Sequence, residues 1–152
     1  MNPQIISKGE KAEALFMQGY NCSQAVASAF ADEMNMRDTD VARLTMGFGG
    51  GMGRMREVCG AVSGMAFVIS ALYADEGRAS VYEKIQTVAE KFEAENGSIV
   101  CRELLGLDKD GKRNPIPEPR TEQYYKKRPC NQLVHMAADI LEKFLKNDCL
   151  KR

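Results

Sequence analysis

The chemistry that the sequence suggests rests on four of its five cysteines, each near the expected start of a different helix: Cys22, Cys59, Cys101 and Cys130. At a helix start, unpaired backbone N–H groups and the positive end of the helix dipole stabilise a thiolate. The thiolate is the form of cysteine that attacks disulfides and binds metal ions. These four cysteines are therefore the candidate catalytic residues, and the same four are the candidate metal ligands.

Basic neighbours distinguish some of these thiols from the others. Cys59 follows Arg54 and Arg56, and Cys130 follows the basic residues at 126–128. Nearby positive charge lowers the pKa of a thiol. We therefore expect Cys59 to react first and Cys130 to react second.

The spacing of the four cysteines leaves three functions open, because no two of them form a C-x-x-C pair. In the first, a thiol–disulfide oxidoreductase that requires no cofactor makes and breaks disulfides within the chain or with a redox partner or small thiol. In the second, the same four cysteines hold zinc or an iron–sulfur cluster. In the third, they only pack within a non-catalytic helical module. The basic residues beside the thiols favour the first.

Two further features are weaker candidates for function. His135, the only histidine, lies one turn beyond Cys130 and could serve as a base or a fifth ligand. The glycine-rich segment 47–53 leads to Arg54 and Arg56, but it fits neither nucleotide-binding glycine motif, and no strand is expected before it. We expect this segment to pack beside the cysteine that follows it rather than to bind an anion.

Composition and charge limit the class of protein and its partners. The 152-residue chain carries 21 Lys and Arg residues against 21 Asp and Glu residues, which disfavours nucleic acid or an anionic membrane surface as a partner. Hydrophobic residues make up 44% of the chain and charged residues 28%, so we assign residues 1–152 to one folded domain.

Five cysteines are too few for a secreted disulfide scaffold, and the N-terminus lacks a signal-peptide pattern, so we expect free thiols in the cytoplasm. The longest uncharged stretch, 58–74, is too short and too mixed for a membrane span.

Apolar residues recur at helical spacing almost throughout, which predicts an all-α fold. Helical spacing covers seven ranges, and because some of them are short we expect a bundle of about six helices: 8–18, 22–35, a short range through Val41 and Leu44, 56–73, 79–95, 98–105 and 129–147. Gly60 and Gly64 share a face of the 56–73 helix, where another backbone can approach closely. Residues 107–123 hold three prolines among mixed charges, which predicts a long exposed connection before the last helix.

The segments around the four cysteines resemble a known family over nearly the whole chain. The resemblance is carried by GYNCSQAV at 19–26, GMG at 51–53, CGAVSG at 59–64, CRELLG at 101–106 and KRPC at 127–130. These segments are similar to the family named for its C_GCAxxG_C_C pattern, whose members are described as redox-active and are commonly encoded near transporter genes. The resemblance implies that the four cysteines take the four positions of the pattern, that the chemistry is redox, and that the protein is associated with a transport system. Cys149 has no counterpart in the pattern, and we expect it to be incidental.

Overall fold

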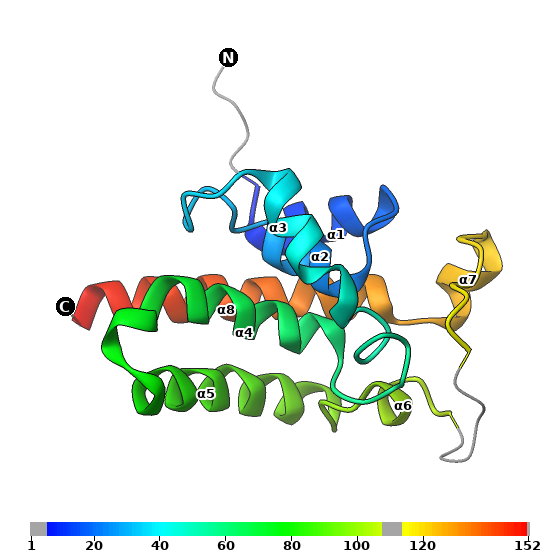
Figure 1. Ribbon diagram of the computed structural model, residues 1–152. Coiled ribbons are helices and arrows are strands. Elements are labelled where there is room, and N and C mark those ends of the chain that lie inside the picture. Colours follow the sequence, from blue (N-terminus) through cyan, green and yellow to red (C-terminus); the bar gives the residue numbers. More distant parts are fainter. Residues whose placement is uncertain (1–5, 108–113, 152) are drawn as a thin grey trace.

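The fold is built from helices (Figure 1). The computed structural model describes residues 6–107 and 114–151. Within these residues the only strand pairing is an isolated bridge between Val58 and Val100, so the all-α prediction is confirmed. The described residues form eight α-helices and two 3-10 helices rather than about six helices: α1 (Lys8–Met17), α2 (Cys22–Ser28), α3 (Asp38–Thr45), η1 (Met46–Phe48), α4 (Gly60–Tyr73), η2 (Ala74–Glu76), α5 (Arg78–Asn96), α6 (Cys101–Leu104), α7 (Glu122–Lys127) and α8 (Cys130–Lys151).

Three long helices form one part of the bundle, two shorter helices, α1 and α2, pack against it, and α3 packs on α2. α4, α5 and α8 contact one another and run side by side in Figure 1, while α1 packs on α8 and α2 packs on α4. The large core side chains are at most 2% exposed and include Phe16, Phe30, Met65, Phe92 and Leu141. Burial of each such side chain stabilises the fold by about 1.5–3 kcal/mol. This core fixes the starts of α2, α4 and α8 relative to one another.

Gly64 marks a close approach between α2 and α4. A Cβ atom on Gly64 would lie 3.0 Å from the carbonyl oxygen of Ser23 and 3.0 Å from Cβ of Val26, both in α2. Protein interiors have no spare volume at such distances, so a larger side chain would push the helices apart. The expected close approach of another backbone to this face of α4 is confirmed.

The second helix is shorter than its apolar pattern predicts. α2 ends at Ser28, and residues 29–35 form successive turns instead of continuing the helix to residue 35. The N–H groups of Phe30 and Ala31 donate to carbonyl oxygens three residues earlier, and Asn35 has left-handed backbone with φ of 54°. The apolar side chains keep their spacing through these turns, so periodicity alone does not reveal the end of the helix.

One other boundary and one additional helix also differ from the prediction, while the remaining helix ends shift by a few residues. α4 begins at Gly60 rather than near residue 56, because most of residues 50–56 have left-handed backbone, which a right-handed helix cannot include. α7 was not predicted. It begins after Thr121, whose side chain accepts a hydrogen bond from the N–H of Tyr124. Its sequence is short and follows prolines, so it carries no helical period.

The described part of the predicted connection crosses the end of the bundle. Residues 114–119 are exposed, whereas 108–113 lie outside the described residues. Arg120 donates hydrogen bonds to the carbonyl oxygens of Phe16 at 3.0 Å and Tyr20 at 2.9 Å. Its guanidinium also lies 4.0 Å from the centre of the Phe16 ring. These contacts attach the segment to the end of α1.

The substitution Gly64→Ala tests the close approach of α2 to α4. We expect it to lower the free energy of unfolding by about 1–3 kcal/mol, because the added methyl group overlaps α2. Gly47→Ala is the control, since a Cβ atom there would meet no atom within 4 Å. Chemical denaturation of the reduced protein measures both changes. A Gly64→Ala variant as stable as the control would contradict the packing described.

Candidate functional site

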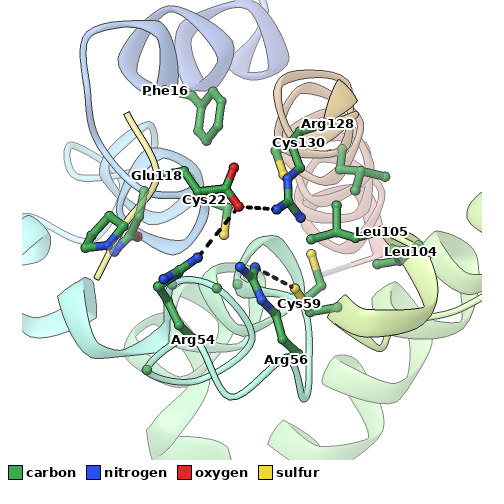
Figure 2. Close-up of a pocket in the computed structure, with 18 of the residues that line it drawn as sticks. Phe16, Cys22, Arg54, Arg56, Cys59, Leu104, Leu105, Glu118, Arg128 and Cys130 are labelled. Atoms are coloured by element: carbon green, nitrogen blue, oxygen red, sulfur yellow. Dashed lines mark hydrogen bonds and ion pairs between the residues drawn. The ribbon is translucent and has the colours of Figure 1, made fainter. Parts of the chain in front are cut away.

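All four candidate cysteines line one pocket at the end of the bundle, and its volume is about 400 Å³. Cys22, Cys101 and Cys130 are the first residues of α2, α6 and α8. Cys59 is the residue immediately before α4. Figure 2 shows Cys22, Cys59 and Cys130 around this pocket, with arginine side chains between them. The structure therefore brings together four thiols that are far apart in the sequence.

The position of Cys22 depends on the cap of α2 and on Gly60. The Asn21 side chain accepts a hydrogen bond from the N–H of Gln24 at 2.9 Å, and the Gln24 side chain accepts one from the N–H of Asn21 at 3.0 Å. The Gln24 amide also donates to the carbonyl oxygen of Ala42 at 2.9 Å, which ties this cap to α3. A Cβ atom on Gly60 would collide with the Sγ atom of Cys22. Only glycine at this position lets the Cys22 thiol reach the start of α4.

A short backbone pairing joins the starts of α4 and α6. The N–H of Cys59 donates to the carbonyl oxygen of Ile99 at 2.7 Å, and the N–H of Cys101 donates to the carbonyl oxygen of Glu57 at 2.6 Å. These two hydrogen bonds flank the isolated bridge described above. The pairing holds Cys59 and Cys101 in the wall of the same pocket.

The glycine-rich loop before α4 brings two arginines to the pocket. Arg54, with φ of 59°, and Arg56, with φ of 62°, both have left-handed backbone, which is uncommon for residues other than glycine. Gly51 in the same loop has φ of 74°, and a Cβ atom on it would lie 2.7 Å from Cβ of Cys101. The loop therefore packs tightly against the start of α6, and the Arg54 and Arg56 side chains line the pocket.

Arg56 contacts a different cysteine from the one that the sequence suggests. Its position shortly before Cys59 predicts an effect on that thiol, but its Nη1 atom donates to the Sγ atom of Cys101 at 3.7 Å. A hydrogen bond from a guanidinium favours negative charge on the sulfur that accepts it. Among the four thiols, this contact singles out Cys101.

Burial raises the pKa of the other three thiols. It is the largest cause of the shift at Cys22, at Cys59, whose pKa is raised well above its usual value, and at Cys130, whose pKa is raised to about 11. Negative charge on Cys22 adds to the shift at Cys59 and Cys130, and negative charge on Cys101 adds a smaller effect at these two and also raises the pKa of Cys22. A thiol with a raised pKa stays protonated at neutral pH. The charge of Arg128 lowers the pKa of Cys130 as expected, but burial outweighs it, and no arginine is among the causes of the shift at Cys59. The order in which the thiols react stays a prediction.

One acidic side chain lies among the arginines of the pocket. The charged lining residues are Glu118 and four arginines, Arg54, Arg56, Arg120 and Arg128. The Oε1 atom of Glu118 lies 2.5 Å from Nη2 of Arg128 and 3.9 Å from Nη2 of Arg54 (Figure 2). The pocket thus combines thiols with an excess of positive charge.

The sequence alone does not identify most of the charged pocket residues that lie outside the glycine loop. Glu118 and Arg120 lie in the segment that was predicted to be an exposed connection. Arg128 belongs to the basic run before Cys130, which was the one available signal. No sequence motif marks Glu118 or Arg120, because their role depends on how the connection crosses the pocket.

Cys149 and His135 lie outside the pocket lining. Cys149 is exposed on α8. His135 pairs instead with Glu13, at 2.6 Å from its Nδ1 atom, and with Asp139, at 3.1 Å from its Nε2 atom. The hydrogen bond with Glu13 is the main cause that raises the pKa of His135. In the part of the chain that the structure describes, no three Cys, His, Asp or Glu side chains converge as metal ligands.

The fold and the pocket define an all-helical protein with four thiols and several arginines at one site. The chain belongs to the C_GCAxxG_C_C family, whose model is described as "Putative redox-active protein" and matches residues 20–144. This match includes the four pocket cysteines and ends before Cys149, and it supports a redox role in general terms. No curated protein and no solved structure matches the chain. None of the described helices has the length and apolar character needed to cross a membrane.

Alkylation of the reduced protein tests the order of thiol reactivity. With a limiting amount of iodoacetamide near neutral pH, we expect Cys101 to be labelled before Cys22, Cys59 and Cys130, because its sulfur accepts a hydrogen bond from Arg56 whereas burial raises the pKa of the other three. Raising the pH toward about 11 should accelerate labelling of Cys130 as it ionises. Peptide mapping by mass spectrometry identifies the labelled residues, and exposed Cys149 serves as the internal reference. Labelling of Cys59 before the other pocket thiols would contradict this order.

Proposed function

We propose that the protein is a thiol–disulfide redox protein whose reacting groups are the four pocket cysteines, Cys22, Cys59, Cys101 and Cys130. The observation that carries this proposal is that all four line one pocket together with arginine side chains. Partly burying a guanidinium costs free energy, and thiols that only pack in a core gain nothing from a cation beside them. The arginines around these thiols therefore favour a reactive role. The redox description of the family agrees with this chemistry.

The reaction is an exchange between two protein thiols and one substrate disulfide. A protein thiolate attacks one sulfur of the substrate, forms a mixed disulfide and releases the first substrate thiolate. A second protein thiolate then attacks the protein sulfur of the mixed disulfide, forms a disulfide within the chain and releases the second substrate thiolate. The substrate gains two electrons, the protein loses two, and the protons from the two protein thiols pass to the released thiolates.

Cys101 is the attacking thiol in this proposal. Its sulfur accepts a hydrogen bond from the guanidinium of Arg56, although its side chain is buried like that of Cys59, whereas burial raises the pKa of the other three thiols. Charge on Cys101 also raises the pKa of those three thiols, and formation of the mixed disulfide removes that charge. The first step therefore makes ionisation of the second thiol easier, and one of the remaining three cysteines resolves the intermediate.

We also propose a compartment and a class of partner for this reaction. A reducing compartment such as the cytoplasm suits it, because small thiols there return the protein disulfide to the reduced state. The oxidised partner is a small disulfide or a disulfide of another protein, and no bound cofactor is required. The transport association that the family resemblance implies fits a partner protein of this kind.

The variant Cys101→Ser tests the attacking thiol. Under anaerobic conditions, we expect the reduced wild-type protein to reduce a small disulfide in a two-thiol reaction, and Cys101→Ser to react at least about tenfold more slowly because the nucleophile is lost. Cys149→Ser is the control and should react like the wild type. Thiol counts follow the reaction, and a visible spectrum and metal analysis are recorded on the same sample. Equal rates for Cys101→Ser and Cys149→Ser, or a stoichiometric metal bound to all four cysteines, would contradict the proposal.

The variant Arg56→Gly tests the guanidinium with little strain on the backbone, because glycine readily adopts the φ of 62° found there. We expect alkylation of Cys101 near neutral pH to slow by about tenfold, since a charged hydrogen bond contributes about 1.5 kcal/mol or more. Met52→Gly is the matched control, because Met52 also has left-handed backbone and its side chain is 45% exposed. The two variants should have similar free energies of unfolding. Unchanged alkylation in Arg56→Gly would remove the argument for Cys101.

A further inference from the structure

A carboxylate of the chain itself occupies part of the pocket. Figure 2 shows the Glu118 side chain directed between Arg54 and Arg128. The Arg128 and Arg54 side chains are only 14% and 18% exposed, whereas that of Glu118 is 45% exposed. The two cations therefore belong to the wall of the pocket, and the anion comes from its more accessible side.

The segment that carries this carboxylate, residues 114–119, is exposed and is called the strap below. Arg54 attaches it by donating hydrogen bonds to the carbonyl oxygens of Asn114, at 2.7 Å, and Ile116. The Ile116 residue is 71% exposed, so its side chain does not anchor the strap in the core. Arg120 attaches the residues after the strap to the end of α1, while the Glu118 carboxylate is held by Arg54 and Arg128, and these two are contacts that an anionic ligand can replace.

The pocket concentrates positive charge in a chain whose formal net charge is zero. Four arginines line it against the single carboxylate of Glu118. Burial and the neighbouring charge of Arg56 lower the pKa of Arg54, and Glu118 opposes this shift. If Glu118 left the pocket, Arg54 and Arg128 would lose the one carboxylate among the lining residues. A guanidinium pair in such a setting is suited to binding an incoming carboxylate.

We propose that Arg54 and Arg128 bind the carboxylate group of a small disulfide substrate, and that Glu118 occupies this position until the substrate displaces it. The disulfide part of this proposal rests on the proposed function, whereas the carboxylate site does not. A pocket of about 400 Å³ is large enough for a small molecule. A substrate held by its carboxylate would place its disulfide within the pocket that the four thiols line. Competition from Glu118 lowers the apparent affinity for that substrate.

Three small disulfides that differ in charge test the preference of the pocket. The probes are 3,3′-dithiodipropionate, which is anionic, 2-hydroxyethyl disulfide, which is neutral, and cystamine, which is cationic. Each rate with the reduced protein is divided by the rate with dithiothreitol, which corrects for the intrinsic reactivity of the probe. We expect the anionic probe to be preferred over the neutral one by about tenfold, and the cationic probe to be slowest. Equal corrected rates would overturn the carboxylate site and leave the proposed function standing.

Two pairs of variants test which residues cause the preference for the anionic probe. Glu118→Gln should accelerate reduction of the anionic probe several-fold more than that of the neutral one, and Glu122→Gln, in the exposed first turn of α7, should change neither. Arg128→Gln should reduce the preference by about tenfold, whereas Lys126→Gln, which removes an exposed charge nearby, should retain it. Arg128→Lys keeps the charge and should be intermediate, which guards against loss of the fold in Arg128→Gln. Glu118→Gln changing all three probes equally would overturn the role of Glu118 as a competitor.

Suberate separates binding from redox chemistry, because it carries two carboxylates across the same number of chain atoms as dithiodipropionate but contains no sulfur. Titration followed by NMR should show that suberate binds the reduced protein, more tightly in Glu118→Gln and about tenfold more weakly in Arg128→Gln. If suberate binds in this pattern and no probe is reduced, the carboxylate site stands and the disulfide substrate falls together with the proposed function. If suberate does not bind either the wild type or Glu118→Gln, the carboxylate site is overturned.

Discussion

Close contact between the starts of α2 and α4 determines the arrangement of the whole site. Gly60 leaves the space that the Cys22 sulfur occupies, and Gly64 keeps the next turn of α4 against the α2 backbone. Helices that pack through ordinary side chains lie about 8–10 Å apart, and glycines at the contact allow a closer approach. Because α4 and α2 both also pack on α8, this contact sets where the start of α8 meets them. The pocket is the space enclosed where these helix starts meet.

Two opposing electrostatic effects give chemically identical side chains different properties in this pocket. Burial keeps three thiols protonated, and protonated thiols are poor nucleophiles. The fourth thiol, Cys101, is also buried, but its sulfur accepts a hydrogen bond from the guanidinium of Arg56. Placing that guanidinium requires left-handed backbone at Arg56, which costs about 1–2 kcal/mol in a residue other than glycine. The hydrophobic core offsets this cost, so local strain can persist beside the thiols.

Local features of the sequence predicted the all-α fold and the location of the cysteines at helix starts, because helical periods and caps are short-range. For Cys59 they leave out burial, which opposes the effect of the helix start, since a helix dipole contributes about 0.3–1 kcal/mol whereas full burial can shift a pKa by several units. Burial is a property of the folded chain and cannot be read from neighbouring residues. Glu118 was missed for a related reason, since its contact with Arg54 joins segments far apart in sequence and no periodic pattern marks it. The reactivity of the four cysteines stays a prediction.

The central claim is that the pocket cysteines exchange electrons as one site. The most direct measurement is an anaerobic redox titration of the folded protein, followed by mass-spectrometric mapping of the disulfides formed. The account predicts that thiols disappear in pairs, that each disulfide joins two of the four pocket cysteines, that Cys149 stays free and that a reductant restores every thiol. Disulfides that form only between chains through Cys149, or pocket thiols that stay reduced at every potential until the protein unfolds, would contradict it.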